Sequence, residues 1–342
     1  MSGMSDTNEV GDMGGTGAVM GSAELGHGRN GAVTELGLGA APLGNLFTPV
    51  SDDEAAACVD AAWDSGIRYF DTAPHYGIGL SERRLGAALR GRPRDAYTLS
   101  TKVGRLLEPV AEVTGDDLAN GFAVPATHRR IWDFSADGVR RSIEDSLTRL
   151  GLDRIDIAYL HDPDDHGPQA LAEAYPALEK LRAEGVVRAI GAGMNQSAML
   201  TRFVRETDTD VVLLAGRYTL LDQDGLTELL PEAQRRGVAV VVGGAFNSGL
   251  LADPKPGATF DYAVAPDALL QRALRIKAVC ERHGVPLRAA ALRFPLDHPA
   301  VRSVLVGTRS AAEITDAAAM VAHPIPAGLW DELRGEGLIP CA

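Results

Sequence analysis

From Val33 onward, short apolar runs alternate with segments of helical periodicity. Apolar runs of four to eight residues are typical of parallel strands that are buried on both faces. Eight runs follow this pattern: 36–43, 67–70, 97–100, 155–160, 186–190, 211–214, 238–242 and 301–306. The first run is interrupted by glycines and is the weakest of the eight.

The segments between the runs carry helix signals. Ser51-Asp52-Asp53-Glu54, Ser81-Glu82 and Ser135-Ala136-Asp137 are expected to open helices, because short polar side chains cap the first free amide groups. Eight strands that alternate with helices give a parallel sheet, and eight is a number of strands that closes it. We therefore predict an α/β chain with a single (β/α)₈ TIM barrel over residues 33–342.

An open, doubly wound sheet is the competing architecture. Such sheets usually place the motif Gly-x-Gly-x-x-Gly between the first strand and its helix. The corresponding stretch, Leu36 to Ala41, has only the first two glycines and no helix directly after it. This departure favours the barrel.

The first 32 residues differ from the rest of the chain in composition. They hold nine of the 38 glycines and four of the seven methionines, with no periodicity and no apolar core of a signal peptide. We expect residues 1–32 to be a flexible Gly/Met-rich tail.

Overall composition limits the classes of partner. The formal net charge of −13 disfavours binding to nucleic acid or to an anionic membrane, and no apolar run approaches the roughly 20 residues of a membrane span. Cys58, Cys280 and Cys341 have no metal-ligand spacing, which indicates reduced thiols and a cytoplasmic protein. We expect a small-molecule substrate, while a homo-oligomer remains open.

Two segments are longer than ordinary barrel loops. They run from Gly104 to Asp133 and from Asn247 to Pro266, and each follows a predicted strand. Loops of this length usually form lids or binding surfaces, and barrel active sites lie at the C-terminal ends of the strands. We expect both segments at the C-terminal face.

Three neighbouring strands are predicted to end in ionisable residues. Asp71 ends the second strand, Lys102 the third and His161 the fourth, and Tyr76 follows Asp71 in a loop. Taken singly, each has an ordinary explanation: a turn aspartate, a half-exposed tyrosine, a lysine that reaches solvent and a hydrogen-bonded histidine. Their convergence at one end of a barrel predicts an active site.

Tyrosine acts as an acid or base near neutral pH only when its pKa is lowered. Its free pKa is about 10, and a neighbouring ammonium group favours the phenolate. A buried Lys102 paired with Asp71 is therefore expected to lower the pKa of Tyr76, while His161 donates a hydrogen bond to the substrate oxygen.

Four segments resemble the signatures of the aldo-keto reductase superfamily: 70–77, 80–86, 100–102 and 159–161. The similarity extends from about Leu36 to about Ala319. It implies an NAD(P)-dependent oxidoreductase with a catalytic tetrad of Asp71, Tyr76, Lys102 and His161. Tyr76 would be the acid/base, Lys102 would tune it, Asp71 would hold Lys102, and His161 would orient the substrate.

Three further segments, 41–47, 161–166 and 214–221, resemble a narrower branch, the aldose 1-dehydrogenases acting on L-fucose, D-threo-aldoses, D-arabinose or L-galactose. This resemblance implies oxidation of an aldose at C1 to the lactone. A pyridoxal dehydrogenase belongs to the same branch, so pyridoxal oxidation or aldehyde and ketone reduction at the same site is the alternative.

The same comparison implies the cofactor contacts. Asn195 would hold the carboxamide, and Phe246 would offer an apolar face where the family has a stacking tyrosine. Ala215 stands where the family often has glutamine, which removes that contact. The phosphate end would meet residues at the start of the last barrel helix: Gly307, Thr308, Arg309, Glu313 and Asp316.

Charge at that helix start bears on the choice of cofactor. The 2′-phosphate of NADP needs cations, and Glu313 would repel it, although Arg309 and the helix N-terminus attract anions. We predict NAD preference with measurable use of NADP. Phe47 and Trp132 are predicted to bind the substrate, as aromatic walls against sugar C–H groups.

Three other interpretations stay open at the level of sequence. Lys102 would serve a lyase as a Schiff-base nucleophile, or the barrel would be a non-catalytic binding scaffold. The segment His161 to His166 has residues that suit zinc or manganese, but we expect a solvated acidic loop and no metal.

Overall fold

The computed structural model of the chain describes residues 20–26 and 31–340. Within that part, parallel strands form a closed barrel in which each strand pairs with the next along the chain, and β16 returns to β3. The strands are β3 (Leu36–Gly39), β4 (Tyr69–Asp71), β5 (Thr98–Val103), β10 (Ile157–His161), β11 (Ala189–Met194), β12 (Val211–Ala215), β13 (Ala239–Gly243) and β16 (Val301–Gly307). The predicted (β/α)₈ barrel is confirmed, and the open sheet is excluded.

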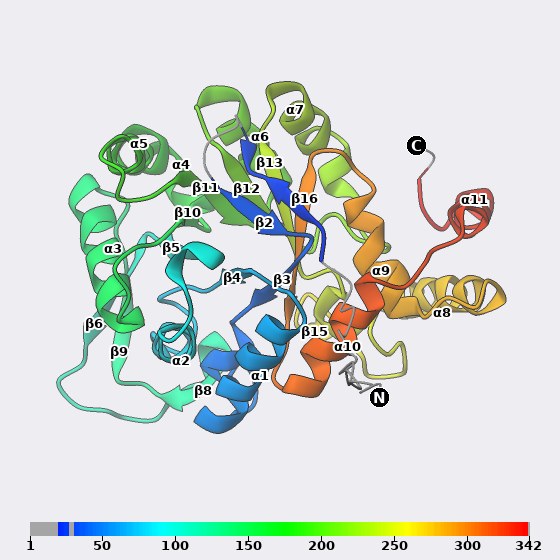
Figure 1. The fold of residues 1–342 in the computed structure, drawn as a ribbon, viewed down its shortest axis with the longest axis horizontal. Coiled ribbons are helices and arrows are strands. Elements are labelled where there is room, and N and C mark those ends of the chain that lie inside the picture. Colours follow the sequence, from blue (N-terminus) through cyan, green and yellow to red (C-terminus); the bar gives the residue numbers. More distant parts are fainter. Residues whose placement is uncertain (1–19, 27–30, 341–342) are drawn as a thin grey trace, which may run out of the picture.

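Helices surround the strands on the outside of the barrel (Figure 1). Those that follow the eight strands are α1 (Asp52–Asp64), α2 (Leu80–Leu89), α3 (Ala136–Leu150), α5 (Tyr175–Ala183), α6 (Ser197–Glu206), α7 (Leu229–Arg236), α9 (Leu287–Leu296) and α10 (Ala311–Val321). Additional helices are α4 (Gly167–Gln169), α8 (Asp267–Arg282) and α11 (Ala327–Gly335). No helix among the described residues is long and apolar enough to cross a membrane.

The predicted helix starts hold for α1 and α3 but not for α2. Ser51 and Ser135 accept hydrogen bonds from the amides of Glu54 and Gly138. Ser81 lies inside α2, which begins one residue earlier. Its hydroxyl instead donates to the carbonyl of Ala40 at 2.7 Å, because this face of α2 is buried against the barrel.

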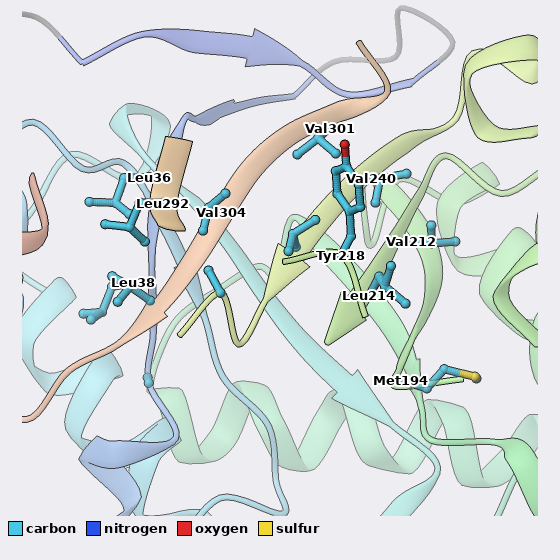
Figure 2. Close-up of a cluster of buried hydrophobic side chains, with 14 of the residues drawn as sticks. Leu36, Leu38, Met194, Val212, Leu214, Tyr218, Val240, Leu292, Val301 and Val304 are labelled. Atoms are coloured by element: carbon cyan, nitrogen blue, oxygen red, sulfur yellow. The ribbon is translucent and has the colours of Figure 1, made fainter. Parts of the chain in front are cut away.

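Two apolar layers stabilise the barrel. The outer layer lies between the strands and the helices, and Figure 2 shows part of it, where side chains such as Leu38, Val304 and Leu292 gather. The inner layer fills the barrel and includes Tyr69 and Leu305. Gly37 points inward, since a Cβ there would lie 2.7 Å from Leu305. Gly37 therefore serves barrel packing rather than a phosphate-binding turn.

A hairpin closes the N-terminal end of the barrel. β1 (Ser22–Glu24) pairs antiparallel with β2 (Ala32–Thr34), and Leu25 and Val33 are buried in the inner layer against the first residues of the strands. The expected flexible tail includes residues 20–26 and 31–32, parts of which are paired in this hairpin. Residues 1–19 and 27–30, which that expectation also covered, lie outside the described residues.

Both long segments lie on the C-terminal side, as predicted. The first forms two hairpins, β6 (Arg105–Pro109) with β9 (His128–Trp132) and β7 (Asp116–Asp117) with β8 (Phe122–Pro125). The second contains β14 (Thr259–Phe260) and β15 (Ala263–Val264). Phe122 contacts the rings of His75 and Tyr76, so the first segment covers the region where the ionisable strand ends meet.

Candidate active site

The last inward-pointing residues of the strands define the C-terminal mouth of the barrel. Side chains two positions apart on a strand face the same way, so the inner residues of each strand identify the residue at its end. On β4, β5 and β10 these are Asp71, Lys102 and His161. On β3, β11, β12, β13 and β16 they are Gly39, Gly193, Ala215, Gly243 and Gly307. One side of the mouth is thus ionisable, and the other has almost no side chains.

Lys102 and Asp71 form a buried ion pair. The Nζ atom of Lys102 donates to Asp71 Oδ2 at 2.6 Å and to the carbonyl of Thr72 at 3.0 Å. Burial alone would lower the pKa of Lys102, but Asp71 and Tyr76 hold it above its ordinary value. Lys102 therefore stays an ammonium group, as the sequence predicts for a lysine at an inner strand end.

Tyr76 lies beside this pair. Lys102 Nζ is 4.8 Å from the centre of the Tyr76 ring. Gly44 and Gly77 hold the Tyr76 loop in place, since a Cβ at Gly77 would lie 2.2 Å from the Gly44 carbonyl oxygen. Only glycines permit this approach of the two loops, which sets the position of the phenol.

The net pKa of Tyr76 differs from the prediction. The net pKa is raised to about 12. Burial is the largest cause and raises it, the Lys102 ammonium lowers it, and the Asp71 carboxylate raises it further. The predicted lowering is therefore wrong for the protein alone, although Lys102 acts in the expected direction. Loss of water around a phenolate outweighs the attraction of one ammonium that is already shared with a carboxylate.

His161 completes the group that the sequence predicts. Its ring lies 5.9 Å from the Tyr76 ring in an edge-on arrangement. Burial, together with the Arg105 and Lys102 cations, holds the pKa of His161 well below its ordinary value. Its Nδ1 atom is buried with no hydrogen-bond partner among the described residues. A neutral imidazole next to the phenol can donate one hydrogen bond to a substrate oxygen.

A chain of hydroxyl groups beneath the tetrad was not predicted. Tyr159 and Tyr69 are hydrogen-bonded at 3.1 Å, Ser100 donates to Asp71 Oδ1 at 2.6 Å, and the Ser100 and Tyr69 hydroxyl oxygens lie 3.2 Å apart, so that Ser100 can accept from Tyr69. Both oxygens of Asp71 are therefore occupied, one by Ser100 and one by Lys102. Alternation along β4, β5 and β10 would have placed these three residues inside the barrel.

The β6–β9 hairpin brings two arginines that sequence reasoning also missed. Arg105 donates a hydrogen bond to Asp162, the residue after His161. Arg130 donates to His75 Nδ1 at 2.5 Å and pairs with the buried Asp117 at 2.6 Å. Burial and these two arginines lower the pKa of His75 to about 2. Arg105 lies only three residues after Lys102, but its contacts depend on the turn at Gly104, and Arg130 lies at the far end of a long segment whose path the local pattern does not predict.

The predicted substrate residues lie at the rim. Phe47 is 47% exposed and contacts Tyr262 of the β14–β15 turn at 5.6 Å. Trp132 is 45% exposed, and the Arg105 guanidinium lies 4.3 Å above its ring. Both are large exposed aromatic residues, and Trp132 is joined through Arg105 to the residue beside His161.

The residues predicted for the nicotinamide end lie on the side of the mouth that lacks large side chains. Asn195 follows β11 directly and is partly exposed. Phe246 follows β13 and packs partly against the outer core. A Cβ at Gly243 would meet Leu213 and Ala215 only at ordinary contact distances of 3.6 and 3.9 Å. This surface of glycine and alanine leaves room for a planar nicotinamide ring.

The start of α10 is already capped by an acidic side chain. Ser310 accepts from the amide of Glu313, and the Glu313 carboxylate accepts from the amide of Arg309 at 2.7 Å. Thr308 is buried against Cys58, 3.2 Å from its sulfur, and Gly307 ends β16. Asp316 pairs with Arg288 at 3.1 Å. The Nε atom of Arg309 is buried without a partner in the described part of the chain.

No group of three histidine, cysteine or acidic side chains in residues 20–26 and 31–340 is arranged to hold a metal ion. Asp162, the first acidic residue of the His161–His166 loop, is paired with Arg105 instead.

Comparisons with known proteins give a consistent picture. The model of the aldo/keto reductase family matches residues 35–335. The chain is 55% identical to D-threo-aldose 1-dehydrogenase from a Pseudomonas species over 314 residues, covering 90% of this chain and 95% of that protein. It is 45% identical to pyridoxal 4-dehydrogenase from Microbacterium luteolum over 332 residues, with 91% and 96% coverage. Among solved structures, an aldo-keto reductase from Bacillus halodurans in its holo form is similar, with a TM-score of 0.72, 28% identity, and 94% and 97% coverage.

Proposed function

Because this chain belongs to the aldo/keto reductase family and is therefore an oxidoreductase that uses a nicotinamide cofactor, we propose that it oxidises an aldose at C1 to the lactone. The observation that carries the proposal is the buried Asp71–Lys102 pair beside Tyr76 and His161. The name of the 55% identical relative supports an aldose as the substrate.

We assign the proton to the Tyr76 hydroxyl. In oxidation, the Tyr76 phenolate takes the proton of the C1 hydroxyl while the C1–H bond breaks. A bound oxidised nicotinamide supplies the acceptor for that hydride. The Lys102 ammonium stabilises the phenolate, and Asp71 with Ser100 keeps Lys102 in position. His161, held neutral, donates a hydrogen bond to the C1 oxygen and orients it toward Tyr76.

The state of Lys102 argues against a Schiff-base lyase. A nucleophilic lysine must be an uncharged amine, and such lysines have lowered pKa values. Lys102 has a raised pKa and donates to Asp71 and Thr72. A passive scaffold would need none of these pairings, which are costly to bury.

The test is a scan of substrates with the purified enzyme. Aldoses, pyridoxal and simple aldehydes are each offered with NAD and NADP or their reduced forms, and the nicotinamide absorbance is followed. We expect NAD reduction with an aldose such as L-fucose or D-arabinose. Turnover of pyridoxal alone would favour the activity named for the 45% identical relative. Reduction of aldehydes without oxidation of any aldose would contradict the proposal.

We propose NAD as the preferred cofactor, with measurable use of NADP. Glu313 caps α10 and places a carboxylate where a 2′-phosphate would need a cation. In Glu313→Arg, the ratio of kcat/KM for NADP to that for NAD should rise at least about tenfold, as expected for one charge-assisted contact. Glu313→Gln is the matched control, since it keeps an oxygen for the cap without adding a cation. A wild type that strongly favours NADP would refute this assignment.

We also propose a cytoplasmic location. The free thiols of Cys58 and Cys280 are buried and unpaired, as is usual in a reducing compartment.

A further inference from the structure

The mouth of the barrel holds an ion pair that the proposed reaction does not use. Arg105 donates a hydrogen bond to Asp162. Asp162 directly follows His161, and Arg105 lies three residues after Lys102. The ion pair therefore connects the ends of the two strands that carry the proposed catalytic residues Lys102 and His161.

The backbone at both residues is specialised. Gly104 has a φ of +103°, and a Cβ there would lie 2.3 Å from Phe134, so the chain can turn sharply just before Arg105. Asp162 has a φ of 43°, a left-handed conformation that is uncommon outside glycine. Such a conformation costs of order 1 kcal/mol, and strained residues of this kind cluster at ligand sites.

Arg105 lies within electrostatic range of the reacting groups. Burial and Arg105 together lower the pKa of His161, and burial lowers that of Arg105 itself while Asp162 and Tyr76 oppose this change. The Arg105 charge therefore lies in the neighbourhood of Tyr76 and His161.

The pair keeps free hydrogen-bonding positions. The Arg105 guanidinium stacks 4.3 Å from the Trp132 ring, which in turn lies 5.2 Å from His166. The Nε atom of Arg105 is buried with no partner in the described ranges, and the Asp162 side chain is 33% exposed. A guanidinium has five N–H donors and a carboxylate has several acceptor positions, so the pair can contact a ligand while the two groups remain bonded to each other.

We propose that Arg105 and Asp162 recognise adjacent hydroxyl groups of a polyhydroxylated substrate, with Trp132 against its C–H face. This inference rests on the proposed aldose oxidation and names the side chains that select the sugar. Adjacent hydroxyls both donate and accept, so one can donate to the carboxylate while the other accepts from the guanidinium. A substrate that lacks these hydroxyl groups leaves the charged groups of the site without hydrogen-bond partners. Sites built in this way strongly disfavour such a substrate.

The test compares D-arabinose with its 2-deoxy and 3-deoxy analogues in the wild type, Asp162→Asn and Arg105→Met. Asparagine tolerates the left-handed backbone, so Asp162→Asn removes the charge with little strain. We expect kcat/KM for D-arabinose to fall at least about tenfold more than kcat/KM for one of the analogues, the range for lost hydrogen bonds to a charged group. Most of the change should appear in KM.

Arg129→Met is the matched control, because Arg129 lies on the same hairpin, is 68% exposed and pairs with Glu108 at the surface. It should leave all three kcat/KM values unchanged. Equal losses for D-arabinose and both analogues in the two mouth variants would assign Arg105 and Asp162 a purely structural role and overturn this inference alone. A wild type that oxidises no aldose would overturn the proposed function as well.

Discussion

At the scale of single residues, the chemistry depends on a balance between desolvation and charge at Tyr76. Burial raises its pKa to about 12 against the pull of Lys102, while Ser100 and Lys102 occupy both oxygens of Asp71. The Lys102 ammonium is therefore shared between a carboxylate and a phenol, and its influence on the phenol depends on how firmly Asp71 is held.

This balance predicts the pH dependence of the reaction. Oxidation requires the phenolate, so kcat/KM for an aldose should rise with pH through the range 7–10, since these values lie below a pKa of about 12. Lys102 lowers the pKa of Tyr76, so Lys102→Met should move the rise to higher pH.

Tyr76→Phe should lower turnover at least about 100-fold while cofactor binding, measured by fluorescence titration, persists. A flat profile in the wild type, or near-normal turnover of Tyr76→Phe, would refute this role.

Sequence reasoning was successful for residues whose position depends only on a strand end. Asp71, Lys102 and His161 follow buried runs directly, so their convergence could be predicted. Three features needed the tertiary structure: the net pKa of Tyr76, which depends on burial, the hydroxyl chain of Ser100, and the Arg105–Asp162 pair. The contacts of Arg105 depend on the turn at Gly104, which the hydrophobic pattern does not reveal.

At the scale of elements, tight helix packing supports the mouth. α2 crosses α3 at Gly86, where a Cβ would lie 1.9 Å from the backbone oxygen of Leu150. Near this crossing, the buried Glu82 accepts hydrogen bonds from Arg149 at 2.5 Å and from Thr101 at 2.9 Å. Thr101 is the neighbour of Lys102, so the helix pair is connected to the strand that carries the ammonium.

This contact predicts that Gly86→Ala destabilises the protein even though alanine is the better helix former. Overpacking costs about 1–3 kcal/mol, and a Cβ this close to a backbone oxygen belongs at the upper end of that range. The gain in helix propensity is about 1 kcal/mol, so a net loss of about 2 kcal/mol in the free energy of unfolding is expected. Urea denaturation measures it. Gly91→Ala, with nothing within 4 Å of the new Cβ, is the control and should change stability by less than about 0.5 kcal/mol. Equal effects of the two substitutions would refute the close packing.

The element pattern itself was largely predictable, because each barrel strand is an apolar run between helix signals. The exceptions are short. Leu25 and Val33 contribute the buried side chains of the β1–β2 hairpin, too few to give a periodicity, and Ser81 resembles a helix cap while its hydroxyl is turned inward.

At the scale of the whole molecule, the two ends of the barrel carry different kinds of side chain. The hairpin closes the N-terminal end with apolar side chains, and the C-terminal mouth collects the ionisable groups on one side and glycines on the other. One side suits proton transfer and the other a flat cofactor ring, so a substrate between them would meet both at once. The Arg105–Asp162 pair lies at the ionisable side, next to His161.

The most direct test of aldose oxidation follows the hydrogen at C1. The wild-type enzyme is incubated with NAD and D-arabinose that carries deuterium at C1, and both products are analysed by mass spectrometry and NMR. Hydride removal from C1 predicts one deuterium in the reduced nicotinamide ring and none in the lactone. Reduced nicotinamide without deuterium, or no lactone from this sugar or from C1-deuterated L-fucose or L-galactose, would contradict the proposed function.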